Sequence, residues 1–195
     1  MKFKILPLML LWIFSNSIGA KVLLPEILSD NMVLQQNTKV NLWGKSDPGK
    51  TVEIRPSWTS EITRVKVDTK GNWKVSVATP AASFTPYSIS ISDGEKVTLN
   101  NVLIGEVWLA SGQSNMEMPL NGFWNNPVLK ANETIAMAGQ NKGIRFVTIP
   151  KTAAMEPRET VKGKWQACTP ENAPGFSATA YHFAQMLYQT LNVPI

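Results

Sequence analysis

VLIGEVWLASGQSNMEM, residues 102–118, decides how the rest of the chain is interpreted. Its first ten residues form a nearly continuous apolar run, which is typical of a strand buried on both faces of a parallel sheet. The polar segment GQSN at 112–115 follows at once. We therefore predict a buried strand that leads through a turn into a helix, the place where α/β proteins bind ligands.

Ser114 lies at the start of that predicted helix and has two interpretations. As a nucleophile, it would bring its backbone N–H and the positive end of the helix to a developing oxyanion. Gly112 would then let the backbone turn, and Asn115 could donate a hydrogen bond beside the nucleophile. As a cap, Ser114 would pair with Glu117 in a capping box. Spacing alone favours the cap, because short motifs have many chance matches.

Residues 21–103 alternate between apolar and polar positions in short runs, which indicates half-buried strands. Turn residues separate the runs at 48–49, 70–72 and 93–94. The sequence predicts a small antiparallel β-sandwich without helices. The runs are KVNLW (39–43), TVEIR (51–55), TRVKVD (63–68), WKVSV (73–77), YSISI (87–91) and KVTL (96–99).

Downstream of residue 118 the sequence predicts a strand at 144–149, loops at 119–143 and 151–175, and a short helix at 128–137 within the first loop. A clear helix follows at 177–191, with Ser177 as its cap and Asn192 at its end. Helical spacing places Ala180, Phe183, Ala184, Leu187 and Leu191 on one face and His182, Gln185 and Gln189 on another.

The final residues, Val193-Pro194-Ile195, have the pattern of the start of a further strand. An α/β layer with two strands cannot cover its own sheet faces. We therefore expect 104–195 to be the first part of a larger α/β domain.

Residues 1–20 have the layout of a secretory signal peptide, in which Lys2 and Lys4 precede an apolar run at 5–14 and Gly19-Ala20 close the segment. The run is too short to span a membrane, for which about 20 apolar residues are needed. We predict an exported protein, periplasmic or extracellular, without a permanent membrane anchor.

The formal net charge is +5, but the basic residues form no stripe of the kind that binds phosphate backbones. We therefore expect no nucleic-acid partner. Cys168 is the only cysteine, so no intramolecular disulfide can form. No cluster has metal-ligand spacing and no glycine loop could cradle phosphates, so neither a metal nor a cofactor is predicted.

Three blocks of the sequence resemble the bacterial sialate O-acetylesterases and the related carbohydrate acetylesterases of the SGNH hydrolase superfamily. They are LPEILSDNMVLQQ (24–36), IGEVWLASGQSNMEMPL (104–120) and KWQACTPENAPGFSATAYHFAQML (164–187). The similarity extends from about residue 22 to the last residue. It implies a β-rich domain followed by an α/β/α hydrolase domain of flavodoxin-like architecture. We thus expect a signal peptide at 1–20, an antiparallel β-sandwich domain at 21–103 and a truncated SGNH hydrolase domain at 104–195.

The resemblance implies that Ser114, the serine of GQSN, is the nucleophile and also a backbone oxyanion donor. Gly112, Gln113 and Asn115 would support it. Ser114 would attack the O-acetyl carbonyl of a sialic acid or another acetylated glycan, and water would hydrolyse the acyl-enzyme.

The resemblance also places a second oxyanion donor near Ala178 and Ala180. The family takes its general base from an Asp-x-x-His sequence that has no match here, and the single histidine, His182, fits no catalytic position. Because a serine without a base is a weak nucleophile, we expect this chain to be a nearly inactive fragment.

The sequence also predicts the surroundings of four further side chains. Trp108, in the predicted buried strand, should lie in the core, and Trp165 and Cys168 should pack. Trp124 lies in the loop after Ser114, where it either lines a sugar site or only anchors the loop.

The rival to an esterase is a non-catalytic exported carbohydrate-binding module or a degenerate hydrolase remnant, which the missing base favours.

Overall fold

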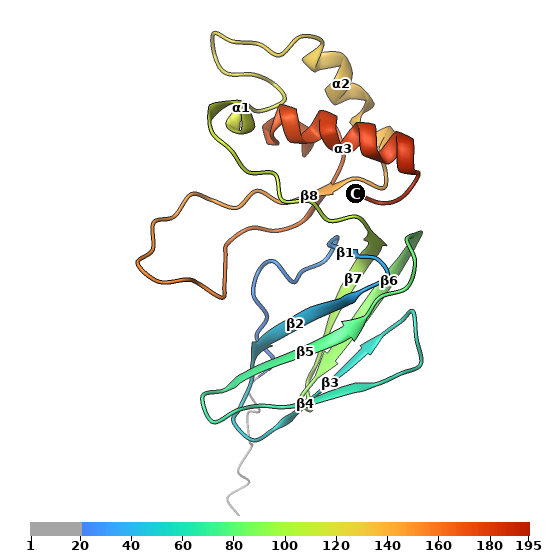
Figure 1. Cartoon of the computed structure of the whole chain (residues 1–195), viewed down its shortest axis with the longest axis vertical. Coiled ribbons are helices and arrows are strands. Elements are labelled where there is room, and N and C mark those ends of the chain that lie inside the picture. Colours follow the sequence, from blue (N-terminus) through green and yellow to red (C-terminus); the bar gives the residue numbers. More distant parts are fainter. Residues whose placement is uncertain (1–20) are drawn as a thin grey trace, which may run out of the picture.

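The computed structural model describes residues 21–195. The predicted signal peptide at 1–20 lies outside the described residues. Seven strands come first along the chain and the helices follow them, at the opposite end of the molecule (Figure 1). The strands are β1 (Val33–Gln35), β2 (Lys39–Lys45), β3 (Thr51–Pro56), β4 (Thr63–Lys66), β5 (Asn72–Ala78), β6 (Ser83–Ser92) and β7 (Lys96–Gly105).

The strands form a five-stranded sheet in the order β1-β7-β6-β3-β4 and a separate antiparallel pair, β2-β5. Within the larger sheet β1 runs parallel to β7, with Val33 opposite Leu103, and the other pairs are antiparallel. The prediction of a β-rich, helix-free segment therefore holds for 21–103. The finer prediction of an antiparallel sandwich needs correction, because the larger sheet is mixed and β1 was missed.

Both sheets contribute to one buried cluster, which is why the alternating runs were informative. Leu42 of β2 and Trp73 of β5 pack in the same cluster as Ile54 of β3 and Ile89 and Ile91 of β6. All five side chains are at most 3% exposed. Burying a large apolar side chain contributes about 1.5–3 kcal/mol, so this cluster is the main stabilising element of the β-rich part.

The turn between β4 and β5 shows how the predicted breaks form. Gly71 has a φ of 80°, which a residue with a side chain rarely adopts. The Asp68 carboxylate accepts the N–H groups of Asn72 and Lys70, each at 2.8 Å. These bonds, first that from Asn72, lower the pKa of Asp68. The local sequence D-x-K-G-N thus specifies the turn on its own.

The second half is helical, with irregular connections. Its elements are α1 (Ser114–Glu117), α2 (Ala131–Met137), η1 (Ala138–Gln140), β8 (Arg145–Phe146), β9 (Gln166–Ala167), η2 (Ala173–Gly175) and α3 (Ala178–Leu191). The helix predicted at 128–137 begins at Ala131. A second buried cluster joins α3 to the preceding loops through Tyr181, Phe146 and Leu120. Cys168 belongs to this cluster and the Trp165 indole donates to the Ile27 carbonyl at 2.9 Å, so both pack as predicted.

Helix α3 confirms the predicted element, and its apolar face is buried only in part. Ser177 caps it, because the Ser177 Oγ accepts the Ala180 N–H at 3.3 Å, and Asn192 ends it in a left-handed conformation. The buried residues are Ala178, Ala180 and Tyr181. Phe183 and Leu191 of the expected apolar face are 45% and 48% exposed. Tyr181, which the apolar pattern did not include, anchors the helix.

The strand predicted at 102–111 is only half correct. β7 ends at Gly105, and Val107, Trp108 and Leu109 are 42%, 56% and 89% exposed. The prediction that Trp108 lies in the core is wrong; its ring meets that of Phe183 edge-on, with centroids 5.2 Å apart. Residues 102–105 have hydrogen-bonded neighbours in β1 and β6, whereas 106–111 have no ladder of their own, so the apolar run loses its regular structure there.

The strand predicted at 144–149 is reduced to β8, which pairs with β9 in an antiparallel sense. Ile195 lies beside it: its N–H donates to the Gly143 carbonyl at 3.1 Å, and its carbonyl accepts the Arg145 N–H at 2.9 Å. These two bonds straddle Ile144, which is the pattern of parallel strands. On the other side the Glu106 N–H donates to the Pro194 carbonyl at 2.9 Å. The predicted strand start at 193–195 is thus strand-like in its bonding.

Among residues 21–195, no helix combines the length and the apolar character needed to cross a membrane.

Candidate active site

Ser114 is the first residue of the four-residue helix α1 and is exposed to solvent. The helix cap is Gln113, whose carbonyl accepts the Met116 and Glu117 N–H groups at 2.9 and 3.2 Å, and no side chain caps the helix. The alternative that Ser114 and Glu117 form a capping box is therefore wrong. The hydroxyl of Ser114 is left available, and its N–H is among those that a first turn cannot satisfy internally. A helix of one turn adds little dipole, so the helix-end argument for Ser114 is weak.

Two neighbours determine how the serine segment is held. A Cβ on Gly112 would come within 2.5 Å of the Met116 Cγ, so the glycine is needed for close packing rather than for an unusual φ. The Asn115 carbonyl accepts the Thr179 hydroxyl at 3.0 Å, which fastens α1 to the first turn of α3. The side chain of Asn115 is exposed and could reach a ligand beside Ser114.

A polar clamp that the sequence analysis missed holds the other end of the segment. The Glu106 carboxylate accepts the side-chain amides of Gln36 at 2.7 Å and Gln35 at 3.0 Å. The Val107 N–H donates to the Gln35 Oε1 at 2.9 Å. The two hydrogen bonds that Glu106 accepts, first that from Gln36 and then that from Gln35, lower its pKa. A single carboxylate within the apolar run 102–111 was the signal that could have revealed this clamp.

The structure brings the second predicted oxyanion region close to α1 but uses its donors elsewhere. The Ala178 N–H donates to the Met118 carbonyl at 2.8 Å. The Ala180 N–H donates to the Ser177 Oγ at 3.3 Å. In this arrangement neither group is free to bind an oxyanion, although both lie on the helix that contacts Asn115.

No base is paired with Ser114 among the described residues. His182 is exposed on α3 and meets the Tyr181 ring edge-on, with centroids 5.6 Å apart. Glu117 forms an ion pair with Lys151. Trp124 is 97% exposed and so is not an anchor of its loop in this structure. Residues 21–195 contain no group of three His, Cys, Asp or Glu side chains arranged to hold a metal.

The Ser114 segment therefore holds some of the groups that a serine hydrolase needs. It offers an exposed hydroxyl with an open backbone N–H on a short helix, held between the Gln35-Gln36-Glu106 clamp and the start of α3. Such a group can attack a carbonyl once a base removes its proton.

Comparison with known proteins relates the whole described chain to acetylesterases. It is 30% identical to a sialate O-acetylesterase of Pongo abelii over 98% of this chain, and 29% identical to that of Homo sapiens over the same share. A crystal structure of a carbohydrate acetylesterase from Xanthomonas citri superposes with a TM-score of 0.81, at 34% identity over 89% of this chain. No protein-family model matches.

The chain spans 38% of the length of the two curated relatives and 39% of the Xanthomonas chain. Its resemblance to the sialate O-acetylesterases and carbohydrate acetylesterases is confirmed over nearly its whole length. Its β-rich and helical halves occur together in a solved acetylesterase structure.

Proposed function

We propose that this chain is the serine-bearing portion of a carbohydrate O-acetylesterase, a carboxylic ester hydrolase that removes acetyl groups from sialic acid or another acetylated glycan. The observation that carries the proposal is the similarity to acetylesterases across 98% of the chain, which includes the exposed Ser114 segment. Export to the periplasm or the medium is part of the proposal and rests on residues 1–20 alone.

In the proposed reaction the Ser114 Oγ attacks the acetyl carbonyl and a general base takes its proton. The sugar oxygen leaves with that proton, and water then cleaves the acetyl-serine to acetate and free serine. The Ser114 N–H would stabilise the oxyanion. The base is not assigned to any of these 195 residues, so we propose that it comes from polypeptide beyond them and that the chain is a fragment of the enzyme.

A fluorophosphonate probe tests the nucleophile directly, because it labels an activated serine covalently. We expect peptide mapping to place the label at Ser114, slowly in buffer and faster when imidazole replaces the missing base. Ser114→Ala should abolish the label, and Ser111→Ala, which removes another exposed serine three residues away, should keep it. Equal labelling of Ser111 and Ser114, or none at either with imidazole present, would reject Ser114 as the nucleophile.

The rival proposal is a non-catalytic carbohydrate-binding module, and the almost fully exposed Trp124 favours it. Exposed aromatic rings supply large contact area for a ligand. This alternative predicts glycan affinity that Trp124→Ala removes, with no labelling of Ser114. A single labelling experiment therefore distinguishes the two proposals.

A further inference from the structure

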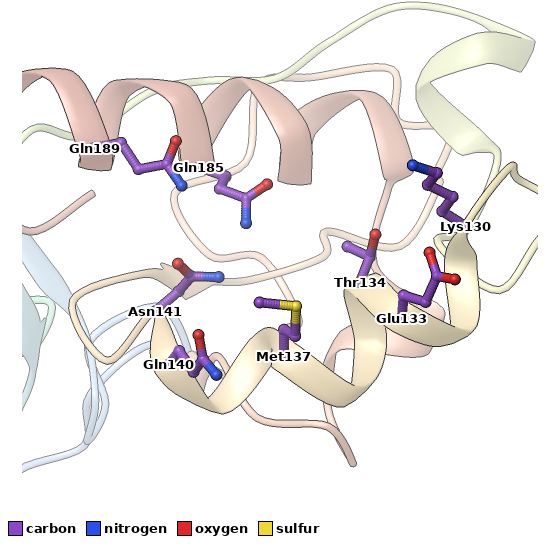
Figure 2. Close-up of a pocket in the computed structure, with 8 residues that line it drawn as sticks. All are labelled: Lys130, Glu133, Thr134, Met137, Gln140, Asn141, Gln185 and Gln189. Carbon is purple, nitrogen blue, oxygen red and sulfur yellow. The ribbon is translucent and has the colours of Figure 1, made fainter.

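A pocket lies between α2 and α3, separate from the Ser114 segment. It has a volume of about 260 Å³, and carboxamide side chains dominate its walls. Figure 2 shows Gln185 and Gln189 of α3 facing Met137, Gln140 and Asn141 on the opposite wall. We propose that this pocket binds a neutral sugar unit of a glycan whose acetyl ester is carried by another unit of the same chain.

Asn141 gives the pocket a fixed polar group. The residue is 6% exposed, and its Nδ2 donates to the fully buried Tyr181 hydroxyl at 3.0 Å. This bond orients the amide, and no described residue donates to its Oδ1. A buried, oriented acceptor in a pocket wall is the kind of group that fixes the orientation of a ligand.

The surrounding side chains match the chemistry of a sugar. Each carboxamide offers two donors and an acceptor, and a sugar hydroxyl likewise donates and accepts. Met137 is 52% exposed and presents an apolar surface to the C–H face of a ring. Lys130 and Glu133 line the far end with opposite charges, so the pocket has no net charge to select an anion or a cation. A neutral, hydroxyl-rich ligand fits these walls best.

The position of the pocket connects it to the proposed active site, and in this respect the inference rests on the proposed function. Thr179 of α3 contacts Asn115, beside Ser114. At about 1.5 Å per residue, Gln185 lies about 9 Å further along the helix and Gln189 about 15 Å. A glycan of several units could therefore present its ester at Ser114 and a more distant unit at the pocket. The enzyme would select oligosaccharides over single sugars.

The test uses the purified chain in NMR titrations of the side-chain amides. The probes are two trisaccharides without an O-acetyl ester, the N-acetylated triacetylchitotriose and xylotriose. We expect at least one probe to bind with millimolar affinity and to shift the Gln185 and Gln189 amide signals. Loss of one hydrogen bond costs about 0.5–1.5 kcal/mol, so Gln185→Ala or Gln189→Ala should weaken binding about two- to tenfold. Gln189 is exposed and Gln185 half-buried, and both lie within helix α3, where alanine is well tolerated.

Gln166→Ala is the matched control, since Gln166 is an exposed glutamine on β9 outside the pocket. Binding that survives in Ser114→Ala but is weakened by both pocket variants supports the sugar pocket, whatever the outcome of serine labelling. Absence of binding by both probes up to millimolar concentration, or equal weakening by Gln166→Ala, would overturn it.

Discussion

Gly105→Ala should loosen the connection between β7 and the helical half. A Cβ at this position would lie 2.0 Å from the Pro194 carbonyl oxygen and 2.8 Å from its Cβ, so the backbone at 194 must move. That movement breaks the bond from the Glu106 N–H to the Pro194 carbonyl. Overpacking of a tight site costs about 1–3 kcal/mol and a lost hydrogen bond about 0.5–1.5 kcal/mol. We expect the free energy of unfolding to fall by about 2–4 kcal/mol.

Urea denaturation followed by tryptophan fluorescence measures this loss, and Gly175→Ala provides the control. A Cβ on Gly175 meets nothing within 4 Å, so that variant should change the unfolding free energy by no more than about 0.5 kcal/mol. Hydrogen exchange adds the location: the amide of Glu106 should lose protection in Gly105→Ala and keep it in Gly175→Ala. Equal stability of the two variants would refute the reasoning, because the contact at Pro194 would then contribute nothing to the free energy of unfolding.

Three smaller predictions follow from buried and charged groups. Tyr181→Phe should lower the unfolding free energy by about 1–3 kcal/mol in urea denaturation, because it leaves the buried Asn141 Nδ2 without its acceptor; a loss below about 0.5 kcal/mol contradicts this. The pKa of Glu106 is lowered from its ordinary 4.5 by the Gln36 and Gln35 amides, so the stability that it adds is complete above pH 4.5 and is lost as the pH falls through the folded pKa. The difference in urea midpoint between the native chain and Glu106→Gln should shrink accordingly in acid, and a constant difference from pH 7 to 3 speaks against the clamp. Cys168 is 3% exposed and burial raises the pKa of its thiol, so iodoacetamide at pH 8 should modify it only after unfolding, as mass spectrometry can determine.

The sequence predicted best where the structure is local. Alternation and turn residues identified β2 to β7 because each strand has one buried face, and the D-x-K-G-N turn is closed by its own side chain. Helix α3 was identified from its Ser177 cap and its Asn192 end. These features depend on neighbours within a few residues, so no knowledge of the fold was needed.

It predicted worst where partners are distant in the chain. β1 is three residues long and pairs with β7 about 70 positions away, so no periodicity marks it. The buried face of α3 is set by Tyr181 and its bond to Asn141, which apolar spacing does not indicate. The Glu106 clamp joins side chains 70 and 71 positions apart, and only the lone charge hinted at it.

The same distinction explains the candidate site. A block of sequence singles out Ser114 as the candidate, but two contacts between distant parts of the chain position it. They are Glu106 with Gln36 on one side and Asn115 with Thr179 on the other. Helix α3 contacts one side of α1, and the segment before α1 is held to the β-rich half through Glu106. In the proposed mechanism, a base that activates Ser114 therefore has to approach from the side of α1 that α3 does not cover. His182 is directed to solvent on α3 itself, so it is poorly placed for that role. Imidazole in solution, in contrast, can reach the open side, which is why it should accelerate labelling of Ser114 where His182→Ala leaves the labelling unchanged.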